Sequence, residues 1–164
     1  FYPKTFIKYA REQEHVFVTR TFSKLFSMAG CRLGYVAGWS EGVKMVQKLC
    51  TPHNTNAFAM KFAEEIIEHP EVLNALIANF NEGRQYLIDA LDANGYQHKG
   101  EAGNFIFIKV NTDAEKIVAR MKAEKKILIK SYANVGDFGT CLRVSIGEKK
   151  FMEQFMNALL ELDK

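Results

Sequence analysis

The most informative part of this 164-residue sequence is the stretch Thr19-Arg20-Thr21-Phe22-Ser23-Lys24, continued by LFSMAGCRLGY over residues 25–35. It lies between two short apolar runs, residues 16–19 (VFVT) and residues 33–37 (LGYVA). Neither run alternates with polar residues, which is typical of strands covered on both faces. Residues 21–30, between the runs, are therefore predicted to be a polar loop of small residues that joins two buried strands, with Lys24 just past the first.

The residue types in this loop suit a phosphorylated aldehyde. Lysine amines form Schiff bases with aldehydes, including pyridoxal phosphate, once they lose their proton. Burial and a nearby cation such as Arg32 both favour that loss. Thr21, Ser23 and Arg32 are the hydroxyl and guanidinium donors that a phosphate needs, and Gly30 is expected to allow a tight turn. On residue types alone, a surface loop with a solvated lysine is the better interpretation. The order of the residues along the whole stretch changes this preference in favour of a cofactor site.

The whole stretch resembles the cofactor-lysine signature of fold-type I pyridoxal-phosphate aminotransferases of classes I and II, and it is most similar to the histidinol-phosphate aminotransferase group. In that family a strand leads to Thr-x-Ser-Lys, a short apolar run, Ala-Gly-x-Arg and Gly-Tyr or Gly-Phe. The matching positions are Thr21, Ser23, Lys24, Ala29, Gly30, Arg32, Gly34 and Tyr35. The resemblance implies pyridoxal 5'-phosphate as cofactor, Lys24 as its catalytic lysine, and Thr21, Ser23 and Arg32 as further cofactor contacts.

The resemblance continues through the rest of the chain. Residues 52–56 (PHNTN) look like the family's Pro-x-Asn-x-Asn segment, and residues 103–105 (GNF) look like its first small-domain strand. Residues 141–147 (CLRVSIG) resemble its Leu-Arg-[Ile/Val]-Ser-[Ile/Val]-Gly motif, in which the arginine binds the substrate α-carboxylate. In strand geometry, Arg143 lies on the face opposite Leu142 and Val144, fixed by a packed sheet. Without the motif, an exposed strand arginine would be the better interpretation.

The remaining pattern predicts the domain organisation. Helices are expected at residues 40–49, with Ser40 as cap, and at 56–94, broken at Pro70 and stopped at Gly95. Strands at 104–110, 126–130 and 141–146 alternate with helices at 113–123 and 149–162 in a β-α-β-β-α unit. The predicted class is α/β. Residues 1–55 would be a three-layer αβα fragment of the large cofactor domain, 56–94 an interdomain helix, and 95–164 a small α+β domain.

Composition excludes several function classes. The 22 basic and 19 acidic residues leave a net charge of +3, too small a surplus to indicate nucleic-acid binding. No run of 18 apolar residues predicts a membrane span, and no Cys-x-x-Cys or Cys/His cluster predicts a metal site. Three widely spaced cysteines favour a reducing, cytoplasmic location over a disulfide framework.

Enzymes of the resembled family are about twice as long, and they act as homodimers on amino acids and 2-oxo acids. Their glycine-rich phosphate segment and the aspartate that pairs with the cofactor's ring nitrogen have no counterpart in these 164 residues. Residues 1–2 are interpreted as the tail of the segment that carries this aspartate. We therefore expect the chain alone to be inactive, with an exposed apolar seam around residues 16–18 and 33–37.

Two alternatives stay open at this point. A pyridoxal-phosphate decarboxylase or β-lyase of the same fold would use the same lysine with a different reaction at the α-carbon. A non-catalytic binding or interaction module would need only the α+β unit of residues 95–164, and it would leave Lys24 and Arg32 without a purpose.

Overall fold

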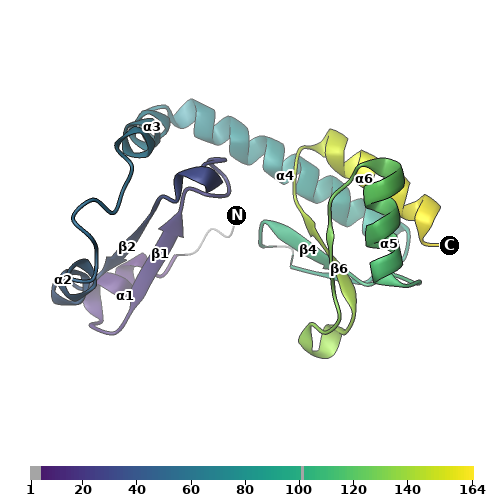
Figure 1. Cartoon of the computed structure of the whole chain (residues 1–164), viewed down its shortest axis with the longest axis horizontal. Coiled ribbons are helices and arrows are strands. Elements are labelled where there is room, and N and C mark those ends of the chain that lie inside the picture. Colours follow the sequence, from purple (N-terminus) through teal and green to yellow (C-terminus); the bar gives the residue numbers. More distant parts are fainter. Residues whose placement is uncertain (1–4, 101) are drawn as a thin grey trace. The chain divides into compact units, whose positions relative to one another are not determined.

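The structure is a computed structural model, and it describes residues 5–100 and 102–164 (Figure 1). Residues 1–2, interpreted above as the tail of an upstream segment, lie outside the described residues. The chain divides into two compact units, one ending at Leu76 and the other beginning at Ile77. Each unit is described by itself below.

The first unit is built around two antiparallel strands, β1 (Phe17–Thr21) and β2 (Gly34–Gly38). Both strands were predicted from the apolar runs, and both are confirmed with their bounds shifted by one or two residues. Helix α1 (Ile7–Glu12), which the sequence did not predict, precedes them. Helix α2 (Ser40–Gln47) follows them. The predicted Ser40 cap is wrong, because Trp39 occupies the cap position and Ser40 is the first helical residue.

The long helical region is two helices, α3 (Ala57–Glu68) and α4 (Pro70–Ala93). Asn56 caps α3, since its Oδ1 accepts from the N–H groups of Phe58 at 2.9 Å and Ala59 at 3.2 Å. The predicted break at Pro70 is confirmed, because proline fits the first turn of a helix but not its interior. Gly95, at φ +73°, ends α4, and the Tyr96 N–H returns to the Leu91 carbonyl at 3.0 Å.

The core of the first unit is small. It consists of Phe22, Met28 and Leu33 from the segment between the strands, packed on Ala59 and Ala63 of α3. The expected apolar seam is seen in part: Phe17 is 41% exposed and Tyr35 is 54% exposed, whereas Leu33 is only 6% exposed.

The second unit holds a four-stranded antiparallel sheet in the order β3-β4-β6-β5. Its strands are β3 (His98–Lys99), β4 (Phe105–Ile108), β5 (Lys130–Tyr132) and β6 (Cys141–Ser145). Helix α5 (Ala114–Arg120), capped by Asp113 and prolonged by a π-helical turn (Met121–Lys125), precedes β5. Helix α6 (Lys149–Leu162) closes the chain with the predicted bounds.

The predicted β-α-β-β-α order is confirmed for this unit, with β3 as an additional short strand. The bounds predicted for its middle strand, 126–130, are wrong, because only Lys130 of that range lies in β5. Lys126 has a left-handed backbone, φ +59°, and ends the π-helical turn, so the strand begins only at Lys130. Ile127 and Ile129 pack against the core from an irregular connection instead.

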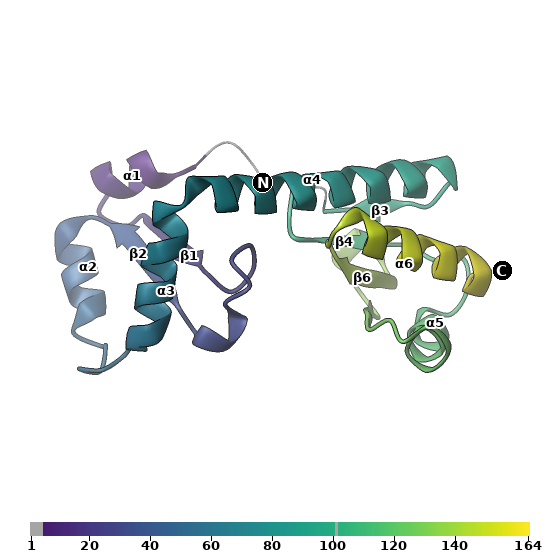
Figure 2. The ribbon, with the colours of Figure 1, turned by 90° about the horizontal axis from the view of Figure 1, so that it is seen from above.

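Helices α4, α5 and α6 lie on one side of the second-unit sheet (Figure 2), and the core lies between them and that face. Ile106, Ile108, Leu142 and Val144 alternate along β4 and β6 and are buried beneath helices α4, α5 and α6. The intervening residues, including Phe105, Phe107 and Arg143, therefore lie on the opposite face, which we call the open face.

Over residues 5–100 and 102–164, no helix is long and apolar enough to cross a membrane. The same residues contain no group of three or more acidic, histidine or cysteine side chains that could hold a metal ion. Cys31, Cys50 and Cys141 are free thiols.

Candidate functional site

The loop that carries Lys24 is closed at its base by the β1–β2 ladder. Thr21 pairs with Gly34, and the Phe22 N–H extends the ladder by one bond to the Leu33 carbonyl at 3.1 Å. A Cβ at Gly34 would lie 2.7 Å from the Arg20 carbonyl oxygen, so only glycine allows this approach of the strands. The ladder thus fixes Thr21 beside the strand that follows Arg32.

Hydrogen bonds within the loop shape the segment around Lys24. The Thr21 hydroxyl accepts the Ser23 N–H at 3.0 Å, and the Lys24 carbonyl accepts the Ser27 N–H at 3.0 Å. The tight turn expected at Gly30 is present, because Gly30 is the middle residue of a 3₁₀ turn (Ala29–Cys31) in which the Cys31 N–H donates to the Met28 carbonyl at 3.1 Å. Gly30 itself has no positive φ, and the left-handed residues are Ser27 (φ 55°) and Arg32 (φ 51°). Non-glycine residues rarely hold this conformation, and it marks the loop as a constrained one.

Apolar side chains pack the loop against the core of the first unit. The buried Phe22 ring lies 4.7 Å from the Phe26 ring and 6.4 Å from the Tyr35 ring. Met28 is buried in the same cluster against α3. The loop is therefore held at both ends, while the polar side chains between its anchors stay accessible.

The four predicted cofactor residues all belong to this one loop and its base. Lys24, Thr21 and Arg32 are exposed, and Ser23 is half-buried, so the burial expected of Lys24 is absent from this chain. Arg32 Nη1 donates to the Ala29 carbonyl at 3.1 Å, which orients the guanidinium and leaves further N–H donors. Two hydroxyls, a guanidinium and an amine form a donor set that fits a phosphorylated aldehyde.

Arg143, the predicted carboxylate-binding residue, lies in the second unit on β6. It is half-buried on the open face, directly opposite Phe107 of β4 and Lys130 of β5. Its guanidinium carbon lies 4.1 Å from the centre of the Phe105 ring. A guanidinium held against an aromatic face by cation–π attraction keeps its N–H edge available for a planar anion.

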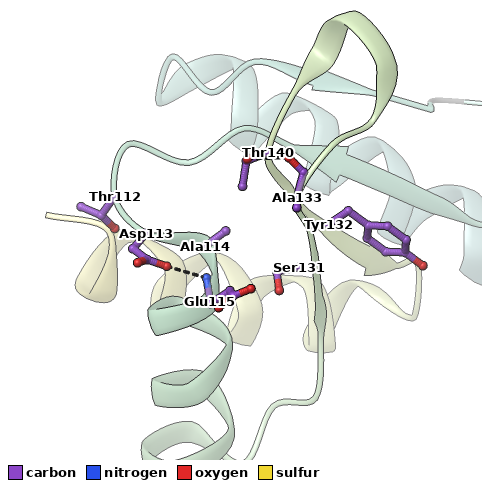
Figure 3. A pocket seen from close by; sticks show the side chains of 8 residues that line it. All are labelled: Thr112, Asp113, Ala114, Glu115, Ser131, Tyr132, Ala133 and Thr140. Atoms are coloured by element: carbon purple, nitrogen blue, oxygen red, sulfur yellow. Dashed lines mark hydrogen bonds between the residues drawn. The ribbon is translucent and has the colours of Figure 1, made fainter.

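A cavity of about 380 Å³ in the second unit contains none of these residues (Figure 3). It lies beside the start of α5 and strand β5, and polar groups from Asp113, Glu115 and Ser131 line it. The Asp113 carboxylate is already engaged as the cap of α5, accepting the Glu115 N–H at 2.9 Å. We therefore place the candidate chemistry at the loop and on the open face rather than in this cavity.

Sequence reasoning missed one buried carboxylate, Asp163, which is 7% exposed. Its oxygens accept the Thr112 hydroxyl at 2.7 Å, the Thr112 N–H at 2.8 Å and the Asn111 N–H at 3.0 Å. Burial alone would raise the pKa of Asp163, but these hydrogen bonds outweigh it and lower the pKa. Its position one residue after a well-predicted amphipathic helix was the only available signal.

Comparison with known proteins assigns the family. A family model described as aminotransferase class I and II matches residues 3–159. The chain belongs to this family. A similar curated aminotransferase is histidinol-phosphate aminotransferase 1 of Ralstonia nicotianae, 34% identical over 149 residues that cover 90% of this chain and 39% of that one. The chain thus spans less than half the length of this relative.

Solved structures of similar fold include further aminotransferases. The histidinol-phosphate aminotransferase of Clostridium acetobutylicum aligns with TM-score 0.86 and 22% identity, over 97% of this chain and 49% of that one. The Sinorhizobium meliloti enzyme, solved in complex with pyridoxal-5'-phosphate, aligns with TM-score 0.82 and 23% identity, over 95% and 43%. A decarboxylase from Sulfurospirillum multivorans aligns with TM-score 0.86 and 17% identity, over 98% and 42%. The chain therefore has an α/β fold similar to pyridoxal-phosphate aminotransferase structures.

Proposed function

We propose that these residues form the C-terminal part of a pyridoxal-phosphate-dependent aminotransferase that moves an amino group between an amino acid and a 2-oxo acid. Residues 1–55 belong to the large cofactor domain with its three-layer αβα architecture, residues 56–94 to the interdomain helix, and residues 95–164 to the small domain. The complete protein works as a cytoplasmic homodimer. Family membership supports this assignment.

The observation that carries the proposal is the constrained loop after β1. It presents the Lys24 amine together with the Thr21 and Ser23 hydroxyls and the Arg32 guanidinium. Thr21, Ser23 and Arg32 would hold the cofactor phosphate, and the Lys24 amine would attach at its aldehyde carbon. When bound, pyridoxal phosphate withdraws electrons from a bond that breaks at the substrate α-carbon.

Lys24 would have a second task once the amino group of the substrate has displaced it from the aldehyde carbon. The freed amine would take the proton from the substrate α-carbon and return it at the former aldehyde carbon. Proton transfer needs an amine within hydrogen-bonding distance of the substrate. Because the loop is fixed at both ends, the range of positions that the Lys24 amine can reach is limited. Arg143 binds the substrate carboxylate through its planar fork and so orients the α-carbon. Arg143 is accordingly a binding residue, and Lys24 is the catalytic residue.

The amino-group donor is an amino acid or a related amine, with a histidinol-phosphate-like or aromatic side chain. The identity of the relative from Ralstonia nicotianae supports the first of these. The decarboxylase of similar fold supports a second candidate, loss of the carboxylate instead of the amino group. Arg143 suits both reactions, so product analysis has to separate them.

The proposal is tested with the complete protein supplied with pyridoxal phosphate, an amino-acid donor and 2-oxoglutarate. We expect a keto acid derived from the donor, and we expect Lys24→Ala to lower kcat by at least about a thousandfold because the proton-transfer group is lost. Lys48→Ala, an exposed lysine at the end of α2, is the matched control and should retain activity. An amine and carbon dioxide as products would establish the decarboxylase instead.

The 164-residue chain by itself should not catalyse the transfer. Its Lys24 is exposed, whereas a nucleophilic amine needs burial or close cations to lose its proton at neutral pH. The same assay on the purified chain with pyridoxal phosphate checks this expectation, and robust turnover would contradict it.

A further inference from the structure

Helix α4 is hydrogen-bonded to the turn that leads into strand β4. Arg84, in the second half of α4, donates from Nη2 to the Gly103 carbonyl at 2.6 Å. Gly103 closes this turn, since its own N–H donates to the Gly100 carbonyl at 3.0 Å. A charged donor makes a stronger hydrogen bond than a neutral one. The contact therefore ties the turn to the helix.

The helix also orients the Arg84 side chain that makes this contact. The guanidinium carbon lies 4.7 Å from the centre of the Phe80 ring, one helical turn earlier on α4. Arg84 is half-buried, so part of its water shell is replaced by protein. Cation–π attraction and partial burial both restrict the positions that an arginine can take. The donor that reaches the Gly103 carbonyl is thus held by its own helix.

The residue before Arg84 brings α4 against the segment that follows strand β6. Gly83 is buried, and a Cβ at this position would overlap the Gly147 carbonyl oxygen, so the helix lies directly on that backbone. The Ile146 N–H in turn donates to the Asn104 carbonyl at 3.0 Å. Two successive residues of α4 therefore contact the segment before β4 and the segment after β6, which are bonded to each other.

The turn that Arg84 holds leads directly to the aromatic neighbour of Arg143. Only Asn104 separates Gly103 from Phe105, the first residue of β4. The Phe105 ring centre lies 4.1 Å from the Arg143 guanidinium carbon. Cation–π attraction requires the cation to stay over the ring face within about 6 Å. A displaced turn would move Phe105 and so change the orientation of Arg143.

We propose that Arg84 is a positioning residue for the proposed amino-group transfer. It holds the turn before β4, so that Phe105 keeps its ring against Arg143 and the guanidinium presents its donors to the substrate carboxylate. The inference rests on the proposed function for the role of Arg143. Arg84 acts through Phe105, and its loss should weaken substrate binding rather than proton transfer at Lys24.

Steady-state kinetics of the complete, cofactor-loaded protein with an amino-acid donor and 2-oxoglutarate test the proposal. Arg84→Met should raise KM for the donor about three- to tenfold and change kcat by less than about twofold, because the carboxylate contact loosens while the proton-transfer group stays in place. Arg84→Lys should restore KM to within about twofold, since lysine keeps a charged donor. Arg120→Met is the matched control, because Arg120 is an exposed arginine of α5, and it should leave both values unchanged.

A double variant separates an effect through Phe105 from a general disturbance of the fold. Arg84→Met combined with Phe105→Leu should have the same KM as Phe105→Leu alone, because no ring is left to position. Effects on KM that multiply in the double variant would overturn the inference. So would a fall in kcat at unchanged KM, or Arg84→Lys as impaired as Arg84→Met. If Arg84→Met does not fold, Arg84→Gln, whose side chain is shorter and uncharged, takes its place in the same comparison.

Failure of the proposed function is distinguishable, because the unsubstituted protein would then transfer no amino group. In that case NMR of the complete protein with isotope-labelled arginine replaces the kinetic readout. The Phe105 ring current shifts the resonances of the Arg143 side chain upfield. Arg84→Met should reduce this shift by at least about half and Arg84→Lys should keep it, because the shift falls steeply with distance from the ring. An unchanged shift in Arg84→Met would refute the positioning role.

Discussion

Arg143 is held by an aromatic ring rather than by a carboxylate. Its guanidinium lies 4.1 Å from the Phe105 ring centre, and Phe105 is two residues along β4 from Phe107, the register partner of Arg143. A carboxylate partner would compete with the substrate for the same N–H donors, whereas an aromatic face orients the group and leaves those donors available. Phe105 is therefore a positioning residue for Arg143.

We predict that Phe105→Leu raises KM for a carboxylate substrate of the complete protein by roughly three- to thirtyfold with a smaller change in kcat, because cation–π attraction contributes about 0.5–2 kcal/mol. Phe105→Trp should keep KM near its original value. Steady-state kinetics on both variants check the prediction. A fall in kcat alone, or the same KM increase for both variants, would contradict it.

At the scale of elements, Asp163 ties the end of α6 to the connection that leads into α5. It accepts the N–H groups of Asn111 and Thr112 and the Thr112 hydroxyl. A buried carboxylate with several donors stabilises the fold only while it is ionised. The second unit therefore has a pH-sensitive link between two of its helices.

Asp163→Asn should lower the free energy of unfolding by about 2 kcal/mol at pH 7, because charge-assisted hydrogen bonds to a buried group are lost. Since the folded pKa of Asp163 is lowered, its contribution is full above the unfolded value of about 3.9 and disappears as pH falls through the folded pKa. Urea unfolding of both proteins at pH 7 and below pH 4 measures the contribution of Asp163 to the free energy of unfolding at each pH.

The difference between Asp163→Asn and the unsubstituted protein should therefore shrink in acid. Asp89→Asn is the control, because Asp89 is exposed on α4 and, among the residues that the structure describes, accepts a hydrogen bond only from Gln85. A difference that stays constant with pH would contradict the role assigned to the ionised carboxylate.

The elements best predicted from the sequence are those whose buried residues recur at one regular spacing along the chain. Helix α6 has its predicted bounds because Phe155, Leu159 and Leu162 face one core. Ile127 and Ile129 misled the strand prediction, since an irregular connection buries them as well as a strand would. Helix α1 was missed because Ala10 is its only buried residue and gives no apolar stripe.

The candidate site was predictable in its residues but not in its geometry. The order of Thr21, Ser23, Lys24 and Arg32 identified the loop, whereas the left-handed backbone at Ser27 and Arg32 has no sequence signal. The pairing of Lys99 with Phe107 was equally hidden, because it depends on a two-residue strand that no pattern predicted. Register places residues side by side, and it is fixed only by the whole sheet.

At the scale of the whole molecule, the first unit carries large apolar side chains that are almost fully exposed. Phe58 of α3 is 89% exposed and Leu49, just after α2, is 87% exposed. Large exposed apolar side chains mark surfaces that another element or chain covers. This agrees with our proposal that residues 1–55, which include Leu49, are one part of a larger cofactor domain joined to the interdomain helix that carries Phe58.

We predict that the purified chain binds the dye ANS and that Leu49→Ser together with Phe58→Ser reduces the dye's emission at least about twofold, because apolar surface is removed. Phe151→Ser, at a less exposed position of the second unit, is the control and should have a smaller effect. Fluorescence titration checks this. Unchanged emission in the double variant would contradict the surface assignment.

The central claim is that Lys24 is the residue that holds pyridoxal phosphate. The most direct measurement is borohydride reduction of the complete, cofactor-loaded protein, followed by peptide mass spectrometry. Reduction makes the bond between a lysine amine and the cofactor permanent, so the labelled position is read directly. We predict the phosphopyridoxyl label on Lys24 and its loss in Lys24→Ala. A label on any other lysine, with Lys24 unmodified, would contradict the account.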